Sequence, residues 1–175
     1  MRHTIVNCTF ECHAGAILEI FNEVIRNTTA LYDYKPRTTK SMMDWFQVKT
    51  TGNFPVIGIE DSRGMLLAFG SYGTFRAWPA YKYTVEHSVY VHADYRGQGF
   101  GRIVMQQLIA EAHKNNLHAM IGGIDATNTS SITLHEHFGF KHVGTFQQVG
   151  FKFGCWIDLS FYQLLLETPT HPIDG

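Results

Sequence analysis

A glycine-rich segment between a predicted strand and a predicted helix constrains this chain more than any other feature. In HSVYVHADYRGQGFGRIVMQQL (87–108), alternating apolar residues lead into Gly97, Gly99 and Gly101, which are followed by apolar residues at helical spacing. A helix start leaves backbone N–H groups unpaired and carries partial positive charge, so glycines there let phosphate oxygens approach bare backbone. The segment therefore predicts a phosphate site, unless its glycines only shape a tight turn.

The residues around this turn argue against two familiar phosphate motifs. Arg96 and Arg102 flank it, and a cation at a helix start is more favourable when an anion binds there. The dinucleotide pattern G-x-G-x-x-G needs a third glycine at position 102 and normally follows the first strand, whereas this turn follows the fourth. A Gly-Lys-Ser/Thr sequence does not occur in the chain.

Hydrophobic periodicity predicts one α/β domain. Strands are expected at 3–8, 54–60, 65–75, 82–91, 118–125, 140–149 and 155–166, and helices at 14–27, 39–52, 99–115 and 128–138. Antiparallel strands followed by strand–helix–strand units favour a mixed, mostly antiparallel, twisted sheet of about seven strands with helices on both faces. Without a linker or repeat, residues 1–167 are expected to form the domain and 168–175 a loose tail.

Composition narrows the function classes. The 14 basic and 15 acidic side chains leave a formal charge of −1, which argues against sequence-independent nucleic-acid binding. The apolar runs are shorter than the about 18 residues of a membrane span, and the N-terminus lacks a secretory pattern, so we expect a cytoplasmic protein. Cys8, Cys12 and Cys155 lack metal-ligand spacing and fit reduced thiols.

A second motif, NTSSITLHEHFGF, places three polar residues on one edge of a predicted helix. At about 100° per residue, Asn128, Ser131 and His135 share one side, beside an apolar stripe. The pattern indicates a wet groove, although Asn128 and Ser131 also suit a helix start. His135 and His137 are two residues apart, a poor spacing for metal ligands on a helix, so we predict no metal.

These motifs resemble a known family. VYVHADYRGQGFG resembles the acetyl-CoA signature of the GNAT superfamily of N-acetyltransferases, and NTSSITLHEHFGF resembles its second motif. YTVEHSVYV, LHEHFGF and VGFKFGCWIDLSFYQL are also similar to the phosphinothricin and methionine sulfoximine N-acetyltransferases. The resemblance implies the GNAT fold, splayed after the fourth strand, and acetyl-CoA as cosubstrate. It also implies a homodimer that acetylates the α-amine of a small amino-acid analogue. The charge balance and the short apolar runs separately predict no nucleic-acid or membrane partner.

The resemblance also assigns roles to residues. Glu86 matches the general base of the group, and His135 stands where many GNAT enzymes have a tyrosine that protonates the coenzyme A sulfur. Val89 and Val91 would hold the cosubstrate arm through their backbone. Acetyl-CoA is expected to contact Val89, Tyr90, Val91, Arg96, Gly97, Gln98, Gly99, Phe100, Gly101, Arg102, Asn128 and Ser131.

Acceptor contacts are expected from the loop before the fourth strand and from that strand. Arg76 suits a carboxylate or phosphinate. Trp78 replaces an arginine of some phosphinothricin-specific members, which favours a smaller or less charged sulfone or sulfoximine. His87 points away from Glu86 by strand alternation and is a reserve base. The full expected set is Arg76, Ala77, Trp78, Glu86, His87 and Ser88, whereas loop or core roles suit Thr28, Thr29, Lys152 and Trp156 better.

Alternatives accompany these assignments. Glu86 could be a surface carboxylate on a strand, and His135 a helix-face histidine bonded to backbone. The acceptor could be a protein N-terminus or a polyamine. A non-catalytic acyl-CoA sensor would keep the glycine turn and need neither Glu86 nor His135.

Overall fold

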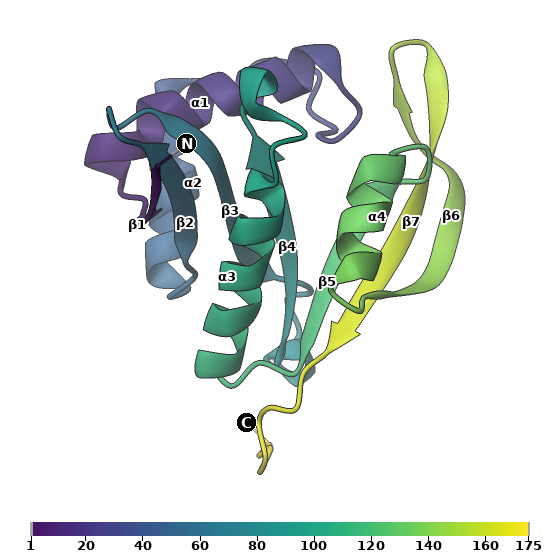
Figure 1. Ribbon diagram of the computed structural model, residues 1–175. Coiled ribbons are helices and arrows are strands. Elements are labelled where there is room, and N and C mark those ends of the chain that lie inside the picture. The colour runs from purple at the N-terminus through teal and green to yellow at the C-terminus, as the bar shows by residue number, and fades with distance from the viewer. Residues whose placement is uncertain (1, 175) are drawn as a thin grey trace. The chain divides into compact units, whose positions relative to one another are not determined.

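The computed structural model describes residues 2–174 (Figure 1). Met1 and Gly175, the outer ends of the predicted domain and tail, lie outside the described residues. The elements are β1 (His3–Asn7), α1 (Phe10–Asn27), α2 (Thr39–Thr51), β2 (Val56–Asp61), β3 (Leu66–Thr74), η1 (Pro79–Tyr81), β4 (Thr84–Val91), η2 (Ala93–Tyr95), α3 (Phe100–Lys114), β5 (Ala119–Asp125), α4 (Thr129–His137), β6 (Lys141–Lys152) and β7 (Cys155–Leu165).

Within the described residues, seven strands hydrogen-bond in the order β1-β2-β3-β4-β5-β7-β6. The predicted mixed sheet is thus confirmed. The chain divides into two compact units. The first unit contains the residues up to Gly73 and Ser88–Leu108, and the second contains Thr74–His87 and the residues from Ile109 onward.

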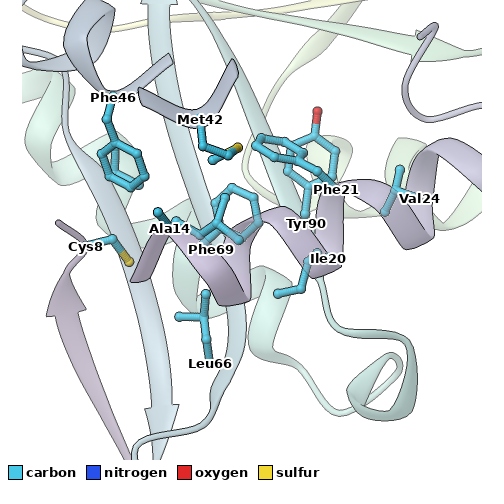
Figure 2. Close-up of a cluster of buried hydrophobic side chains, with 12 residues drawn as sticks. Cys8, Ala14, Ile20, Phe21, Val24, Met42, Phe46, Leu66, Phe69 and Tyr90 are labelled. Carbon is cyan, nitrogen blue, oxygen red and sulfur yellow. The ribbon is translucent and has the colours of Figure 1, made fainter. Parts of the chain in front are cut away.

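The first unit is built around α1, whose apolar residues recur at helical spacing. Helix α1 begins at Phe10, four residues before the predicted start, because the Thr9 side chain caps it by accepting a hydrogen bond from the Cys12 N–H at 3.3 Å. Buried Phe21 packs edge-on against Phe69 of β3 and Tyr90 of β4, with ring centroids 5.1 Å apart in each pair. Figure 2 shows these rings meeting in the core.

Both faces of β3 are covered by helices in this unit. Phe69 points toward α1, whereas a Cβ added to the next residue, Gly70, would lie 2.6 Å from Val104 Cγ1 of α3. Because neighbouring residues of a strand point to opposite faces, α1 and α3 lie on opposite sides of the strand. This arrangement confirms the predicted helices on both faces.

The second unit contains the first half of β4 with β5, β7 and β6. Parallel pairing joins the first three residues of β4, Thr84–Glu86, to the first three of β5, Ala119–Ile121. This short pairing at the strand starts is what the predicted splay requires. Antiparallel pairing then joins β5 to β7 and β7 to β6, and α4 lies alongside β5 (Figure 1).

The C-terminal tail differs from the predicted loose segment. The Thr168 hydroxyl donates to the Leu117 carbonyl at 2.5 Å, and the Ile173 N–H donates to the Tyr83 hydroxyl at 3.1 Å. Both contacts lie inside the second unit. The described part of the tail is therefore tied to the fold by hydrogen bonds that its Thr- and Pro-rich sequence did not indicate.

Candidate functional site

The glycine turn of the first unit joins η2 to α3. Gly97 and Gly99 have φ values of 75° and 86°, in the left-handed region that glycine adopts without strain. A Cβ at either position would meet no atom of the described residues within 4 Å. Backbone conformation, and not crowding by the protein, therefore requires glycine here. The surface beside the turn is left open to a ligand.

Helix α3 begins directly after this turn. The Phe100 ring is buried and anchors the first turn, and the Arg102 N–H donates to the Gly99 carbonyl at 3.0 Å. Arg102 and Gln98 are exposed. The turn thus presents a helix N-terminus and a cation to solvent, which is a suitable arrangement for an anion.

The second half of β4 approaches the turn. Val89 and Val91 are half-buried, as is Ser88. The Tyr90 side chain belongs to the core, where it packs against Phe21 and Phe69. Any contact of Tyr90 with a cosubstrate must therefore be made through its backbone.

Arg96 has partners that the sequence did not indicate. Its Nη2 forms a very short ion pair with Glu23 Oε2 of α1, and its Nε donates to the Val91 carbonyl at 3.3 Å. Glu23 and Arg96 are 73 residues apart, so no local pattern could have revealed the pair. Glu23 is thus a residue of this region that sequence reasoning missed.

In the second unit, Glu86 lies on an open face of the sheet. A Cβ on Gly123 of β5 would lie 3.2 Å from Glu86 Oε1, and within 3.5 Å of atoms of Leu159 and Phe161. Although Glu86 is exposed by more than a third, partial burial of its carboxyl raises its pKa, and the nearby Arg76 guanidinium opposes that rise. Burial and the positive charge of Arg76 therefore have opposite effects on the pKa of this carboxyl.

His87 occupies the opposite face, as strand alternation predicted. A Cβ on Gly122 would lie 2.7 Å from His135 Nε2 and 3.2 Å from His87 Cε1. His87 is buried and its Nε2 lies 3.0 Å from Nε2 of His135, which is also buried. Burial, reinforced by His135, lowers the pKa of His87 to about 3, so its ring is neutral at physiological pH.

The hydrogen bonds assign the tautomers of this histidine pair. His135 Nδ1 lies 2.7 Å from the Ser131 carbonyl, which can only accept, so Nδ1 carries the proton. Neutral His135 then accepts at Nε2 from the Nε2–H of His87. Burial lowers the pKa of His135, and the Ser131 carbonyl opposes the shift. With both ring nitrogens engaged, the geometry gives more support to the structural interpretation of His135 than to an acid role.

The other residues of the second motif also bond within their own helix. Asn128 is the N-cap of α4, and its Oδ1 accepts from the Ser131 N–H at 3.1 Å. Asn128, Ser131 and His135 do lie on one helical edge, as predicted, and the side chains of Asn128 and His135 each form a hydrogen bond with the backbone of Ser131. For Asn128 this is the helix-start role that the sequence left open.

The loop before β4 is exposed. Arg76 stacks over the Phe75 ring at 5.0 Å, Ala77 is exposed, and Trp78 is 68% exposed and meets Tyr81 edge-on. The loop therefore offers a cation and aromatic surfaces to an acceptor.

The four remaining residues considered from the sequence have simple structural roles or exposed positions. Thr28 caps the end of α1 through a 2.9 Å bond from its hydroxyl to the Val24 carbonyl, and Thr29, half-buried, follows it. Lys152 is buried, and exposed Trp156 packs on Phe151.

Two absences among residues 2–174 bear on the classes of ligand and on membrane insertion. These residues contain no group of three His, Cys, Asp or Glu side chains arranged to hold a metal ion. No helix in the same range is long and apolar enough to span a membrane.

Comparison with known proteins identifies the family. Residues 17–140 match the model of the acetyltransferase (GNAT) family. The chain belongs to the GNAT family. The predicted acetyl-CoA-dependent N-acetyltransferase activity is thereby confirmed at the level of the family.

Relatives cover nearly the whole chain. An L-amino acid N-acyltransferase of Escherichia coli is 38% identical over 90% of this chain and 91% of its own. An L-methionine sulfoximine/L-methionine sulfone acetyltransferase of Pseudomonas paraeruginosa is 40% identical over 86% of this chain and 88% of its own. These relatives match the predicted methionine sulfoximine group.

Solved structures confirm the GNAT fold. An acetyltransferase from Salmonella typhimurium, solved with its cofactor acetyl-CoA, is 35% identical, covers 99% of both chains and superposes with a TM-score of 0.93. A phosphinothricin acetyltransferase from Sinorhizobium meliloti, also in complex with acetyl-CoA, is 29% identical over 98% of this chain and 93% of its own, with a TM-score of 0.92.

Proposed function

We propose that this GNAT enzyme acetylates the α-amine of a small amino-acid analogue such as methionine sulfoximine, methionine sulfone or phosphinothricin. Transfer is direct: Glu86 removes a proton from the amine, the amine nitrogen attacks the thioester carbonyl, and the C–S bond breaks to release coenzyme A as a thiolate, which takes up the proton that the attacking nitrogen loses. The Gly97–Arg102 turn holds the diphosphate, and the backbone of Val89 and Val91 holds the arm.

One observation supports this proposal most directly. In the second unit, partial burial raises the pKa of the exposed Glu86 carboxyl, and the charge of the exposed Arg76 guanidinium acts on the same carboxyl to lower it. An amino-acid acceptor carries an amine that needs a base and a carboxylate that an arginine fork can bind. The names of the relatives, an L-amino acid N-acyltransferase and a methionine sulfoximine/sulfone acetyltransferase, support the same acceptor class.

A thiol-release assay across amine acceptors tests the proposal. Methionine sulfoximine and methionine sulfone should be acetylated faster than phosphinothricin, because Trp78 presents no charge to the phosphinate. Activity confined to peptides or polyamines would show that the acceptor is not a small amino-acid analogue. Coenzyme A binding without activity on any acceptor would favour a sensor.

Replacing Glu86 by glutamine tests the base. The variant should lose about 10²- to 10⁴-fold in kcat, because an amide of similar shape cannot take the proton. Calorimetric binding of coenzyme A should stay at the wild-type value. Unchanged turnover would remove Glu86 from the mechanism.

We also propose that the enzyme is a homodimer in a reducing, cytoplasmic setting. The β6–β7 region carries exposed apolar side chains, among them Phe146, Val149, Phe153 and Trp156, which a second subunit could cover. The free thiols of Cys8, Cys12 and Cys155 fit the reducing setting. Light scattering coupled to size exclusion tests the dimer, and a monomer at micromolar concentration would exclude it.

A further inference from the structure

Arg96, next to the glycine turn, is fixed at two points of its guanidinium. It ends η2 and directly precedes Gly97. Its Nη2 pairs with Glu23 Oε2 and its Nε donates to the Val91 carbonyl at 3.3 Å, so α1 and the end of β4 both hold it. An arginine restrained in this way presents its remaining donors in a defined direction.

Glu23 is itself held in place. Its second oxygen, Oε1, accepts from Asn27 Nδ2 at 3.3 Å, one helical turn further along α1. The side chain of Glu23 is 27% exposed and that of Arg96 is 43% exposed. The result is a chain of four groups, Asn27, Glu23, Arg96 and the Val91 carbonyl, entirely within the first unit.

The remaining donors of Arg96 lie on Nη1. A guanidinium has three nitrogens, and Nε and Nη2 are used by Val91 and Glu23. No residue in the range 2–174 accepts from Nη1, whose two N–H groups are therefore available to a ligand. A diphosphate at that turn offers the oxygens that such donors bind.

We propose that Glu23 is a positioning residue for acetyl-CoA, because it orients Arg96 so that Nη1 faces the diphosphate held by the Gly97–Arg102 turn. The inference rests on the proposed binding of the diphosphate at this turn. Glu23 does not touch the cosubstrate and acts through Arg96.

Glu23 could also weaken cosubstrate binding, because its carboxylate competes with phosphate for Arg96. A carboxylate repels a diphosphate, but solvent and salt screen this repulsion where both side chains are partly exposed. Solvent and salt also weaken the attraction between Glu23 and Arg96, but less, because these two side chains are in direct contact. The second anchor at Val91 also keeps Arg96 near the turn when Glu23 is bound to it. Positioning therefore outweighs repulsion.

Binding measurements with three variants test this inference. Glu23→Ala should weaken coenzyme A binding and raise the KM for acetyl-CoA about tenfold, with kcat within about twofold of wild type. Glu23→Gln should recover most of this loss, because its amide oxygen still accepts from Nη2. Glu19→Ala, an exposed glutamate one turn earlier on α1, is the matched control and should bind as wild type does.

A truncated donor locates the effect at the diphosphate. S-acetylpantetheine carries the thioester arm without the diphosphate, so its KM should be the same in wild type and Glu23→Ala. In an Arg96→Ala background, Glu23→Ala should cause no further loss of coenzyme A affinity. A stability role for Glu23 would instead raise both KM values and change thermal unfolding.

Specific results would overturn the inference. Coenzyme A affinity of Glu23→Ala equal to that of Glu19→Ala would do so, and tighter binding by Glu23→Ala and Glu23→Gln would establish competition instead. If Glu23→Ala does not fold, the folded variant Glu23→Gln decides. Near wild-type affinity of Glu23→Gln for coenzyme A, together with weak binding by Arg96→Ala, supports the inference. Binding by Glu23→Gln that is as weak as that of Arg96→Ala, or tighter than that of wild type, counts against the inference. Wild-type protein that binds no coenzyme A would instead refute the proposed function.

Discussion

Acidification provides a sharp test of the buried histidine pair in the second unit. Burial, reinforced by His135, lowers the pKa of His87 from 6.5 to about 3. Between these two values, the unfolded chain takes up a proton at His87 whereas the folded protein does not. Because the unfolded state then binds more protons, stability falls as the pH drops below 6.5.

The size of this loss follows from the pKa difference. A pH of about 5 lies about 1.5 units below the pKa of the histidine in the unfolded chain, and each pH unit corresponds to about 1.4 kcal/mol of free energy. His87 should therefore lower the free energy of unfolding by about 2 kcal/mol at pH 5 relative to neutral pH. Burial also lowers the pKa of His135, which changes stability in the same direction.

Urea denaturation at about pH 7.5 and pH 5 measures the effect. On acidification, His87→Gln should lose about 2 kcal/mol less than wild type, because glutamine does not titrate. His137→Gln removes an exposed histidine of α4 and should follow the wild-type change. Equal losses for wild type and His87→Gln would refute the assignment of His87 as a buried neutral ring.

Further predictions concern groups near Glu86 and in the first unit. Arg76→Met should move the acid limb of the pH profile of kcat/KM to higher pH, because Arg76 lowers the pKa of Glu86. An acid limb at the wild-type pH would show that Arg76 does not influence the pKa of Glu86. Gly123→Ala should lower kcat about tenfold, because its Cβ would lie 3.2 Å from Glu86 Oε1, while calorimetry should find coenzyme A affinity unchanged. Burial lowers the pKa of Lys49 to about 8, so the folded state holds the lysine charge at a cost at neutral pH. Lys49→Met removes this cost but also the hydrogen bond to the Tyr72 carbonyl, and should stabilise the fold by about 1–2 kcal/mol. A lower urea midpoint than that of wild type would contradict this prediction.

Most elements could be predicted from the sequence because their periodic residues are buried. Ile17, Ile20 and Val24 of α1, for example, are almost fully buried. Residues 150–154, which separate the strands expected at 140–149 and 155–166, are an exception, because β6 continues to Lys152, which pairs with Cys155. The turn consists of Phe153 and Gly154, with φ values of 53° and 76°. Phenylalanine rarely adopts a positive φ, so the pair Phe-Gly did not predict a two-residue hairpin turn.

The candidate site was predictable where its residues are close in sequence. The glycine turn and the strand before it carry a recognisable spacing. Arg96 and Glu23, by contrast, are 73 residues apart, and His87 and His135 are 48 apart. Such pairs depend on which helix packs over which strand, and no periodicity within one segment contains that information.

Two adjacent glycines explain why a carboxylate and a histidine pair coexist in the second unit. Gly122 leaves room for His87 and His135 on one face of β5, and Gly123 leaves room for Glu86 on the other. Because strand residues alternate between faces, exchanging the exposures of Glu86 and His87 would need a one-residue slip of β4. That slip would bury a carboxylate among neutral rings, at a cost of several kcal/mol. The alternation therefore keeps the titrating carboxylate on the accessible face, so Glu86 is the group to test first as the base.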